Sequence, residues 1–379
     1  MAVQFWNIEG EGLSHAVLAC VLTVTAILAV SPWARRIGLV DRPRGRRVHA
    51  DAVPLTGGIG IFLVFAGLSL TLGFRSQLFL SLLLPAGLLL LSGLLDDLLE
   101  LGPLPKFAFQ IAAALVAVTL GDLRLDSLGN LFGQGEIVLG AWSLPFTVFA
   151  LVGVINAVNM IDGMDGLAAF VVLVAAGWLG AVALVTGANG TVLMLLILAG
   201  GLAGFLLLNF RLPWGRQAAV YMGDSGSSVL GFVLAWFAIR LTQAPGTGLY
   251  PISAVWILAL PVIDTLAVMV RRGLGGRNPL RGDRDHVHHV LFGNGLCYGS
   301  TVAMLGLLGF AAGAVGVGGW LLGVSESALF SLLAGILAVH VLLCELGLGV
   351  SRRVRLLPAG RDARSVAATA DDVPAVRES

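Results

Sequence analysis

The sequence predicts an all-α polytopic integral membrane protein with about eleven transmembrane helices. Apolar residues make up 57% of its 379 residues and charged residues only 12%, and the mean hydropathy is +0.93. Soluble domains carry roughly 25% charged residues, so the composition excludes an ordinary soluble domain. The net charge of +1 gives no indication of a nucleic-acid partner, and we expect none.

Eleven apolar stretches approach the roughly 20 residues that a helix needs to cross the hydrocarbon core. The first stretch is too long for the apolar core of a signal peptide and follows no basic segment, so we expect it to remain as a span. In chain order, the predicted spans are 13–31, 58–74, 78–95, 107–121, 143–159, 168–187, 190–209, 226–242, 252–270, 300–322 and 326–349.

Two segments outside these spans have their own patterns. Between the fourth and fifth spans, residues 128–142 read LGNLFGQGEIVLGAW. Apolar and polar residues alternate there around glycines, which predicts a short hairpin at the membrane surface. The tail 356–379 is rich in Ala, Arg, Asp and Ser and is expected to be disordered. Residues 1–355 would then form a single transmembrane domain.

The basic residues predict the orientation. With these spans, 20 of the 23 Lys and Arg residues fall on one side of the membrane, and only Arg75, Arg124 and Arg240 fall on the other. Loops rich in Lys and Arg face the cytoplasm. The N-terminus is therefore expected outside, the C-terminus in the cytoplasm, and the 128–142 hairpin on the periplasmic side.

Nearly all of the unusual polar residues lie on the predicted cytoplasmic side. The outer loops are short and chemically plain, so we expect a functional surface that faces the cytoplasm. Five segments carry it, namely 32–57, 96–106, 159–167, 210–225 and 271–299.

The first of these segments ends in PLTGGIGIF, residues 54–62. Gly57 and Gly58 begin a span, where a backbone can approach a phosphate closely. Tight packing against another helix explains the same residues equally well, so both interpretations stay open.

The second segment holds two adjacent carboxylates, Asp96 and Asp97, and the chain's only lysine, Lys106. A helix end that simply emerges into water is one explanation for the carboxylates. A catalytic group is the other.

The segment NAVNMIDGMDGLA, residues 156–168, is more specific. Asn156, Asn159, Asp162 and Asp165 recur every three residues, so on one helical turn they would share a face. Polar groups at a membrane boundary are costly unless they bind something. Oxygen ligands of this kind suit Mg²⁺, which binds a few protein oxygens together with substrate phosphates. Helix capping is the alternative.

The segment YMGDSGSSVLGF, residues 221–232, places Asp224 and Ser225 between glycines at the start of a span. Unsatisfied backbone N–H groups at such a helix start can hold phosphate oxygens. A simple N-cap is compatible with the same residues.

The last segment, RRGLGGRNPLRGDRDHVHHVLF, spans residues 271–292. A loop that only orients the chain explains its arginines but not its histidines, and the paired Cys/His spacing of a zinc site is absent. Arginine binds phosphate oxygens in bidentate fashion, so we expect a pyrophosphate-binding loop. Its candidate residues are Arg277, Arg281, His286, His288 and His289.

With these motifs in this order, the chain resembles the polyprenyl-phosphate N-acetylhexosamine-1-phosphate transferases, the WecA/MraY group of membrane enzymes. The resemblance covers nearly everything from the first span to the last. NPLRGDRDHVHHVL, residues 278–291, is similar to the WecA-like branch, which uses UDP-N-acetylglucosamine (UDP-GlcNAc) or a related sugar.

The resemblance implies a reaction in the bacterial inner membrane, with an active site facing the cytoplasm. Undecaprenyl phosphate would attack a UDP-N-acetylhexosamine, releasing UMP and leaving a lipid diphosphosugar that initiates synthesis of a cell-envelope glycan. It also implies Mg²⁺, with Mn²⁺ as a substitute, and a homodimer. A phospho-MurNAc-pentapeptide transferase of the same family and a membrane transporter remain as alternatives.

The resemblance also implies roles for the residues. Asn159 and Asp224 would hold Mg²⁺, with Asp162 and Asp165 beside the nucleotide and metal. Asp96 and Asp97 would lie where the lipid phosphate reaches the surface, with Lys106 positioning it. Transfer by direct attack and transfer through a phosphorylated aspartate both remain open. The implied substrate-binding residues are Gly57, Gly58, Asn156, Ser225, Arg277, Arg281, His286, His288 and His289.

Overall fold

The computed structural model describes residues 8–41, 52–210, 218–274, 276, 286–293 and 296–356. The tail predicted to be disordered lies outside them, apart from Leu356. The described residues form α-helices joined by short connections. Their helices are α1 Ile8–Ile37, α2 Gly57–Thr71, α3 Gln77–Leu99, α4 Pro103–Gly121, α5 Ser143–Ile161, α6 Leu167–Val185, α7 Asn189–Asn209, α8 Gly223–Gln243, α9 Pro251–Ile257, α10 Ala259–Leu274, α11 Val287–Gly293, α12 Tyr298–Leu321 and α13 Glu326–Leu356.

The predicted all-helical membrane fold is confirmed. Over the described ranges, nine helices are long and apolar enough to cross a membrane, and a bent pair, α9 with α10, makes up to ten. The apolar helix α2 has only 15 residues, which is short of the roughly 20 that a span needs. Each predicted span therefore has a helical counterpart, although not every counterpart is a full-length span.

The stretch 252–270 is not the continuous span that the sequence predicts. It divides into α9 and α10, whose axes meet at 86°. Pro261 lies in the first turn of α10. Proline lacks the N–H that would bond to the carbonyl four residues earlier, and its ring clashes with that carbonyl. The affected carbonyl belongs to Ile257, the last residue of α9, so the break follows from the proline.

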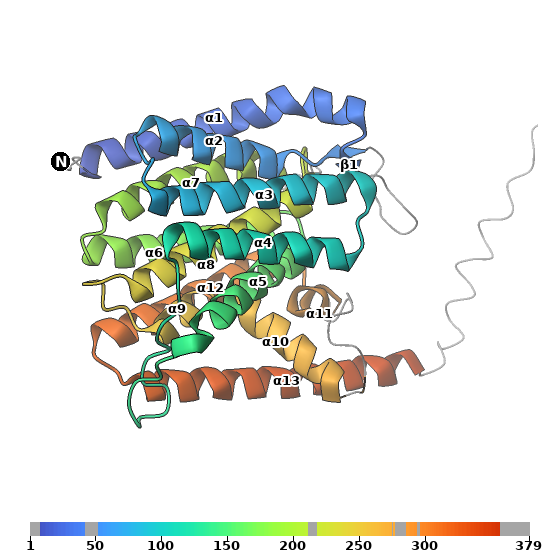
Figure 1. The fold of residues 1–379 in the computed structure, drawn as a ribbon. Coiled ribbons are helices and arrows are strands. Elements are labelled where there is room, and N and C mark those ends of the chain that lie inside the picture. The colour runs from blue at the N-terminus through green and yellow to red at the C-terminus, as the bar shows by residue number, and fades with distance from the viewer. Residues whose placement is uncertain are drawn as a thin grey trace, which may run out of the picture.

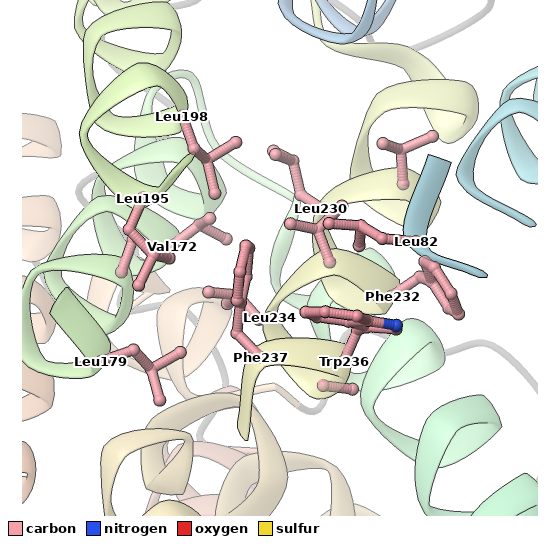
Figure 2. Packing of buried hydrophobic residues seen from close by; sticks show 14 of the residues in the cluster. Leu82, Val172, Leu179, Leu195, Leu198, Leu230, Phe232, Leu234, Trp236 and Phe237 are labelled. Atoms are coloured by element: carbon pink, nitrogen blue, oxygen red, sulfur yellow. The ribbon is translucent and has the colours of Figure 1, made fainter. Parts of the chain in front are cut away.

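Helix α8 lies at the centre of the bundle and packs against α2, α3, α5 and α6. Its aromatic side chains Phe232, Trp236 and Phe237 are fully buried. Figure 2 shows Trp236 and Phe237 among leucines and valines of the surrounding helices, including Leu82 of α3 and Val172 of α6. A central helix of this kind fixes the positions of the helices around it.

Glycines let α8 approach α2 and α3 at backbone contact. A Cβ added to Gly58 would lie 2.2 Å from the Cα of Gly226, and one added to Gly93 would lie 2.2 Å from the Cα of Ser225. Such distances are far below van der Waals contact, so only glycine fits. The N-terminal end of α8 is therefore held directly against the C-terminal end of α3.

The predicted hairpin is present between α4 and α5. Ser127 and Val138 form an antiparallel bridge, and the short helix η1, Gly140–Trp142, follows. Gln243 at the end of α8 accepts hydrogen bonds from the N–H groups of Asp126 and Ser127 at 3.0 and 3.2 Å. A second pairing that the sequence does not predict joins β1, Val40–Asp41, to β2, Val53–Pro54.

The hairpin and the histidine-bearing α11 lie at opposite ends of the bundle. In Figure 1 the N-terminus lies at the left, and β1 and α11 lie at the right. The C-terminal end of α3, the start of α4, the end of α5 and the start of α8 share the end that carries α11, as the contacts described below show. The polar motifs therefore converge at one end of the molecule.

Candidate active site

Three carboxylates meet where α3 and α8 touch. Asp96 and Asp97 occupy the last turn of α3, and Asp224 occupies the first turn of α8. One ligand oxygen from each lies within 4.8 Å of the others. The close approach at Gly93 brings these turns together, so residues about 128 positions apart form one carboxylate cluster of Asp96, Asp97 and Asp224.

Lys106 joins this carboxylate cluster from α4. Pro103 starts α4, where its fixed φ favours the first helical turn, and Lys106 lies in that turn. Its Nζ donates to Asp224 Oδ2 at 2.6 Å and forms an ion pair with Asp96. Lys106 thus pairs with Asp96 and Asp224, and a purely solvated helix end does not account for these contacts.

Asp97 caps the N-terminus of α8 from another helix. Its Oδ1 accepts from the N–H of Asp224 at 3.1 Å, and its Oδ2 accepts from the N–H of Ser225 at 3.4 Å. Negative charge is favourable at a helix N-terminus. The amides that could hold a phosphate therefore bind the carboxylate of Asp97 in this structure.

Gly57 and Gly58 also have their amides engaged. They donate to the carbonyl oxygens of Tyr221 at 2.9 Å and Met222 at 3.1 Å, and both glycines are buried. Of the two interpretations left open by the sequence, these contacts support helix packing, because the N–H groups needed for a phosphate are occupied.

The carboxamides of the 156–165 motif face different helices. Helix α5 ends at Ile161, so the predicted common face stops after Asn159. Asn156 Nδ2 donates to Gln110 Oε1 on α4 at 2.7 Å, and Asn159 Nδ2 lies 3.5 Å from Ser228 Oγ on α8. Asn156 thus joins α5 to α4, whereas Asn159 faces α8 one turn beyond Asp224.

The two aspartates of this motif lie in the loop after α5. Asp162 follows the last residue of α5 as its C-cap. Burial, followed by the negative charge of Asp224 and its neighbours Asp165 and Asp97, raises the pKa of Asp162 to about 7. The backbone carbonyl of Asp165 accepts a hydrogen bond from the hydroxyl of Tyr298 at the start of α12. The loop therefore adds negative charge beside the carboxylate cluster.

The histidine segment lies against the same loop. His288 is fully buried, and its Nε2 lies 2.2 Å from where a Cβ on Gly163 would be. Burial, with a smaller contribution from the charge of His289, lowers the pKa of His288 to about 4. Neither ring nitrogen of His288 has a hydrogen-bond partner among the described residues. A buried polar group without a partner calls for an explanation, and an absent ligand is one.

Two residues that the sequence analysis did not select belong to this region. Gln110 is the buried partner of Asn156 and lies one helical turn beyond Lys106. Asp264 is buried in α10 and contacts His286 through Nδ1 at 2.8 Å. An acidic residue inside an apolar stretch is a signal of function in membrane proteins, and that signal was available for Asp264. Arg277 and Arg281 lie outside the described residues.

The site fits a divalent cation. Magnesium prefers oxygen ligands, with carboxylates and substrate phosphates among them, and the carboxylate cluster supplies the former. Asp96 is 8% exposed, and its buried Oδ1 has no partner in the described part of the chain. A cation placed between Asp96, Asp97 and Asp224 would give that oxygen a ligand and would offset the charge that raises the pKa of Asp162.

Comparison with known proteins agrees with the geometry. A family model described as glycosyl transferase family 4 matches residues 79–242. The chain is 33% identical over 290 residues to the undecaprenyl-phosphate alpha-N-acetylglucosaminyl 1-phosphate transferase of Escherichia coli (strain K12). The aligned residues cover 75% of this chain and 77% of that protein. It is 34% identical over 282 residues to the protein of the same name from Yersinia pestis, with 74% and 77% covered. The protein of that name from Haemophilus influenzae is 33% identical over 304 residues, with 80% and 86% covered. These matches confirm the family resemblance, and the chain belongs to glycosyl transferase family 4 together with these sugar-1-phosphate transferases.

Proposed function

We propose that this protein transfers N-acetylglucosamine-1-phosphate from UDP-GlcNAc to undecaprenyl phosphate. The names of its relatives support undecaprenyl phosphate as the acceptor and N-acetylglucosamine-1-phosphate as the transferred group, and UDP as the carrier follows from the family resemblance. One observation carries the assignment: Lys106 bridges Asp96 and Asp224 at the end of a membrane bundle, where a lipid phosphate and a water-soluble nucleotide can meet. A polyprenyl chain would stay among the apolar helices while its phosphate reaches this cluster.

The proposed reaction is a phosphoryl transfer by direct attack. An oxygen of undecaprenyl phosphate forms a bond to the sugar-bearing phosphorus of UDP-GlcNAc. The bond from that phosphorus to the bridging oxygen of the diphosphate breaks, and UMP leaves with the electron pair. The product is undecaprenyl-diphospho-N-acetylglucosamine, so atoms and charge balance without a further reactant.

Such a transfer depends mostly on positioning and on neutralising charge. The second pKa of a phosphomonoester is about 6, so the lipid phosphate is largely ionised at neutral pH and needs no strong base. Lys106 would bind the phosphate and bring it close to the donor. The carboxylates of Asp96 and Asp97 would orient Lys106 and the start of α8, and one of them would accept any remaining proton.

We propose that Mg²⁺ is the cofactor, held by Asp224 and Asn159 with the adjacent carboxylates. When bound, it would neutralise charge on the diphosphate as the bond to UMP breaks. His288 and His289 would contact the donor from the α11 side, next to the loop that carries Asp162. The buried nitrogens of His288, which have no partner among the residues that the structure describes, support this placement of the diphosphate.

The proposed location is the bacterial inner membrane, with the carboxylate cluster facing the cytoplasm. The distribution of 20 basic residues against three supports this orientation by the positive-inside rule. A homodimer is proposed on the family resemblance alone. In a variant without native cysteines, a cysteine at Glu100 should react only from the cytoplasmic side and one at Gln134 only from outside. Labelling of both from one side would contradict the orientation.

The test of function is product formation by the purified protein. With UDP-GlcNAc, undecaprenyl phosphate and Mg²⁺, we expect UMP and an equal amount of lipid diphosphosugar. Omission of the lipid should abolish UMP release, and chelation of Mg²⁺ followed by its return should stop and restore the reaction. Turnover of UDP-MurNAc-pentapeptide in place of UDP-GlcNAc would instead support the alternative, a phospho-MurNAc-pentapeptide transferase. Transport of a solute without any transfer would contradict the assignment.

A further inference from the structure

Asp264 is a buried carboxylate that none of the proposed steps uses. It is 3% exposed and lies in α10, three residues beyond the proline that breaks the span. Burying a carboxylate in an apolar helix is costly unless partners compensate. Its surroundings should therefore show what the carboxylate binds.

Both oxygens of Asp264 contact the start of the histidine segment. Oδ2 lies 2.8 Å from Nδ1 of His286, and Oδ1 accepts the backbone N–H of Val287 at 2.9 Å. A more distant contact of 3.8 Å joins Oδ1 to Nε2 of His340 on α13. One side chain thus holds both the ring of His286 and the first residue of α11.

A carboxylate that accepts from Nδ1 determines where the proton of the imidazole lies. Each neutral imidazole carries one N–H, and the hydrogen bond at one nitrogen selects the role of the other. With Nδ1–H directed at Asp264, Nε2 of His286 remains as the ring atom that can interact with a substrate.

The ring of His286 is linked to the site through its neighbour. The rings of His286 and His288 are stacked, with centroids 6.0 Å apart and planes 14° apart. His288 in turn packs on Gly163, in the loop that carries Asp162. A shift of His286 would therefore move the histidine that contacts this loop.

We propose that Asp264 is a positioning residue for the nucleotide sugar: it fixes the tautomer and ring orientation of His286, and through α11 it sets His288 against the Gly163 loop. The inference rests on the proposed function, because it assumes that the histidine segment contacts the donor. It adds Asp264 of α10 to the residues proposed to act on the donor. It also predicts that this residue controls kcat/KM for UDP-GlcNAc.

Replacing Asp264 by Asn tests the proposal, because the shape is kept while the amide group donates to Nδ1 and selects the other tautomer. At histidines that bind a metal, loss of such a carboxylate partner typically changes metal affinity or activity by 10- to 100-fold, and we expect an effect of similar size here. We expect kcat/KM for UDP-GlcNAc to fall by at least about tenfold, with KM for undecaprenyl phosphate unchanged. Thr265→Val, at the neighbouring buried position, should leave both constants near wild type. An unchanged kcat/KM in folded Asp264→Asn would overturn the proposal.

A double-mutant cycle separates this inference from the proposed function. If Asp264 acts through His286, Asp264→Asn should cause little further loss in a His286→Ala background. Full additivity would show that Asp264 acts elsewhere. Normal activity of His286→Ala alone would instead contradict the donor-binding role of the histidine segment.

A spectroscopic measurement covers the case in which Asp264→Asn does not fold. The chain has only six histidines, so selective ¹⁵N labelling gives few ring signals, and the signal lost in His286→Gln identifies the ring. We expect a proton on Nδ1 of His286 in the wild-type protein. A ring protonated on Nε2 alone would overturn the proposal without any assay of activity.

Discussion

Lys106 and Asp224 are 118 positions apart in the sequence, yet Nζ of the lysine lies 2.6 Å from Oδ2 of the aspartate. The same ammonium group pairs with Asp96 at the end of α3. Three helices, α3, α4 and α8, thus meet through one positive and two negative charges. The side chain of Lys106 is 32% exposed, so the residue is not sealed inside the bundle.

Replacement of Lys106 by Met should reduce kcat by at least about 100-fold, since a phosphate-binding charge would be lost while the aliphatic stem is kept. UMP release under saturating substrates measures the effect. The matched control is Arg124→Met, which removes an exposed ion pair with Asp122 at 3.0 Å and should be near neutral. Normal turnover by Lys106→Met would contradict the role of the lysine.

Replacement of Gly163 by Ala should impair donor use without unfolding the protein. The new Cβ would lie 2.2 Å from Nε2 of His288, so the ring and the loop must separate. We expect an increase in KM for UDP-GlcNAc of about tenfold, corresponding to 1.4 kcal/mol. Gly153→Ala, in α5, is the control because nothing lies within 4 Å of its added Cβ. Equal KM values in the two variants would argue against contact between the loop and His288.

Gly93→Ala should loosen the junction of α3 and α8. Its Cβ would lie 2.2 Å from the Cα of Ser225, and backbone cannot yield as a side chain can. Overpacking of this kind costs about 1–3 kcal/mol, so the melting temperature in detergent should fall together with kcat. Gly87→Ala, in the same helix, meets only the ring of Phe62 at 3.5 Å and should melt near the wild-type temperature. A Gly93→Ala melting curve that matches the wild type would contradict this packing.

The lowered pKa of His288 predicts that the folded protein loses stability as the pH falls. An unfolded histidine titrates near 6.5, whereas burial lowers the pKa of this one to about 4. Between these pH values the unfolded chain binds a proton that the folded state excludes. The contribution of neutral, buried His288 to the free energy of unfolding is therefore complete above about pH 6.5 and falls as the pH drops toward 4. The drop in melting temperature between pH 7.5 and pH 5 should be larger for wild type than for His288→Gln. An equal drop in both proteins would show that His288 is not buried as described.

Much of the fold could be predicted because transmembrane segments are read from local composition. The sequence also placed Asp96, Lys106 and Asp224 at helix ends on one side of the membrane, although it did not predict that Lys106 contacts the other two. The break at Pro261 was harder to predict. Proline is tolerated inside transmembrane helices when neighbours satisfy the freed carbonyl, so its presence alone does not decide between a bend and a straight span.

What the sequence could not predict in the candidate site is which side chains are partners, because this depends on the tertiary fold. The three-residue spacing of Asn156 and Asn159 suggested a common ligand, but α4 supplies Gln110 to the first and α8 supplies Ser228 to the second. At Gly57 and Gly58 the sequence left phosphate binding and helix packing open, and the carbonyls of the 221–222 segment that bind their amides favour packing. Asp264 is a single polar residue in an apolar stretch, and its contact with His286 appears only once α10 is placed.

The most direct test of the carboxylate cluster as the catalytic centre is the activity of Asp224→Asn. The substitution keeps the size of the side chain and removes the charge that pairs with Lys106 and would bind Mg²⁺. Wild type and variant should be compared at equal amounts of folded protein, with UDP-GlcNAc, undecaprenyl phosphate and millimolar Mg²⁺. We predict an almost complete loss of UMP release with an unchanged melting profile. Wild-type turnover by Asp224→Asn would contradict the proposal that this cluster performs the transfer.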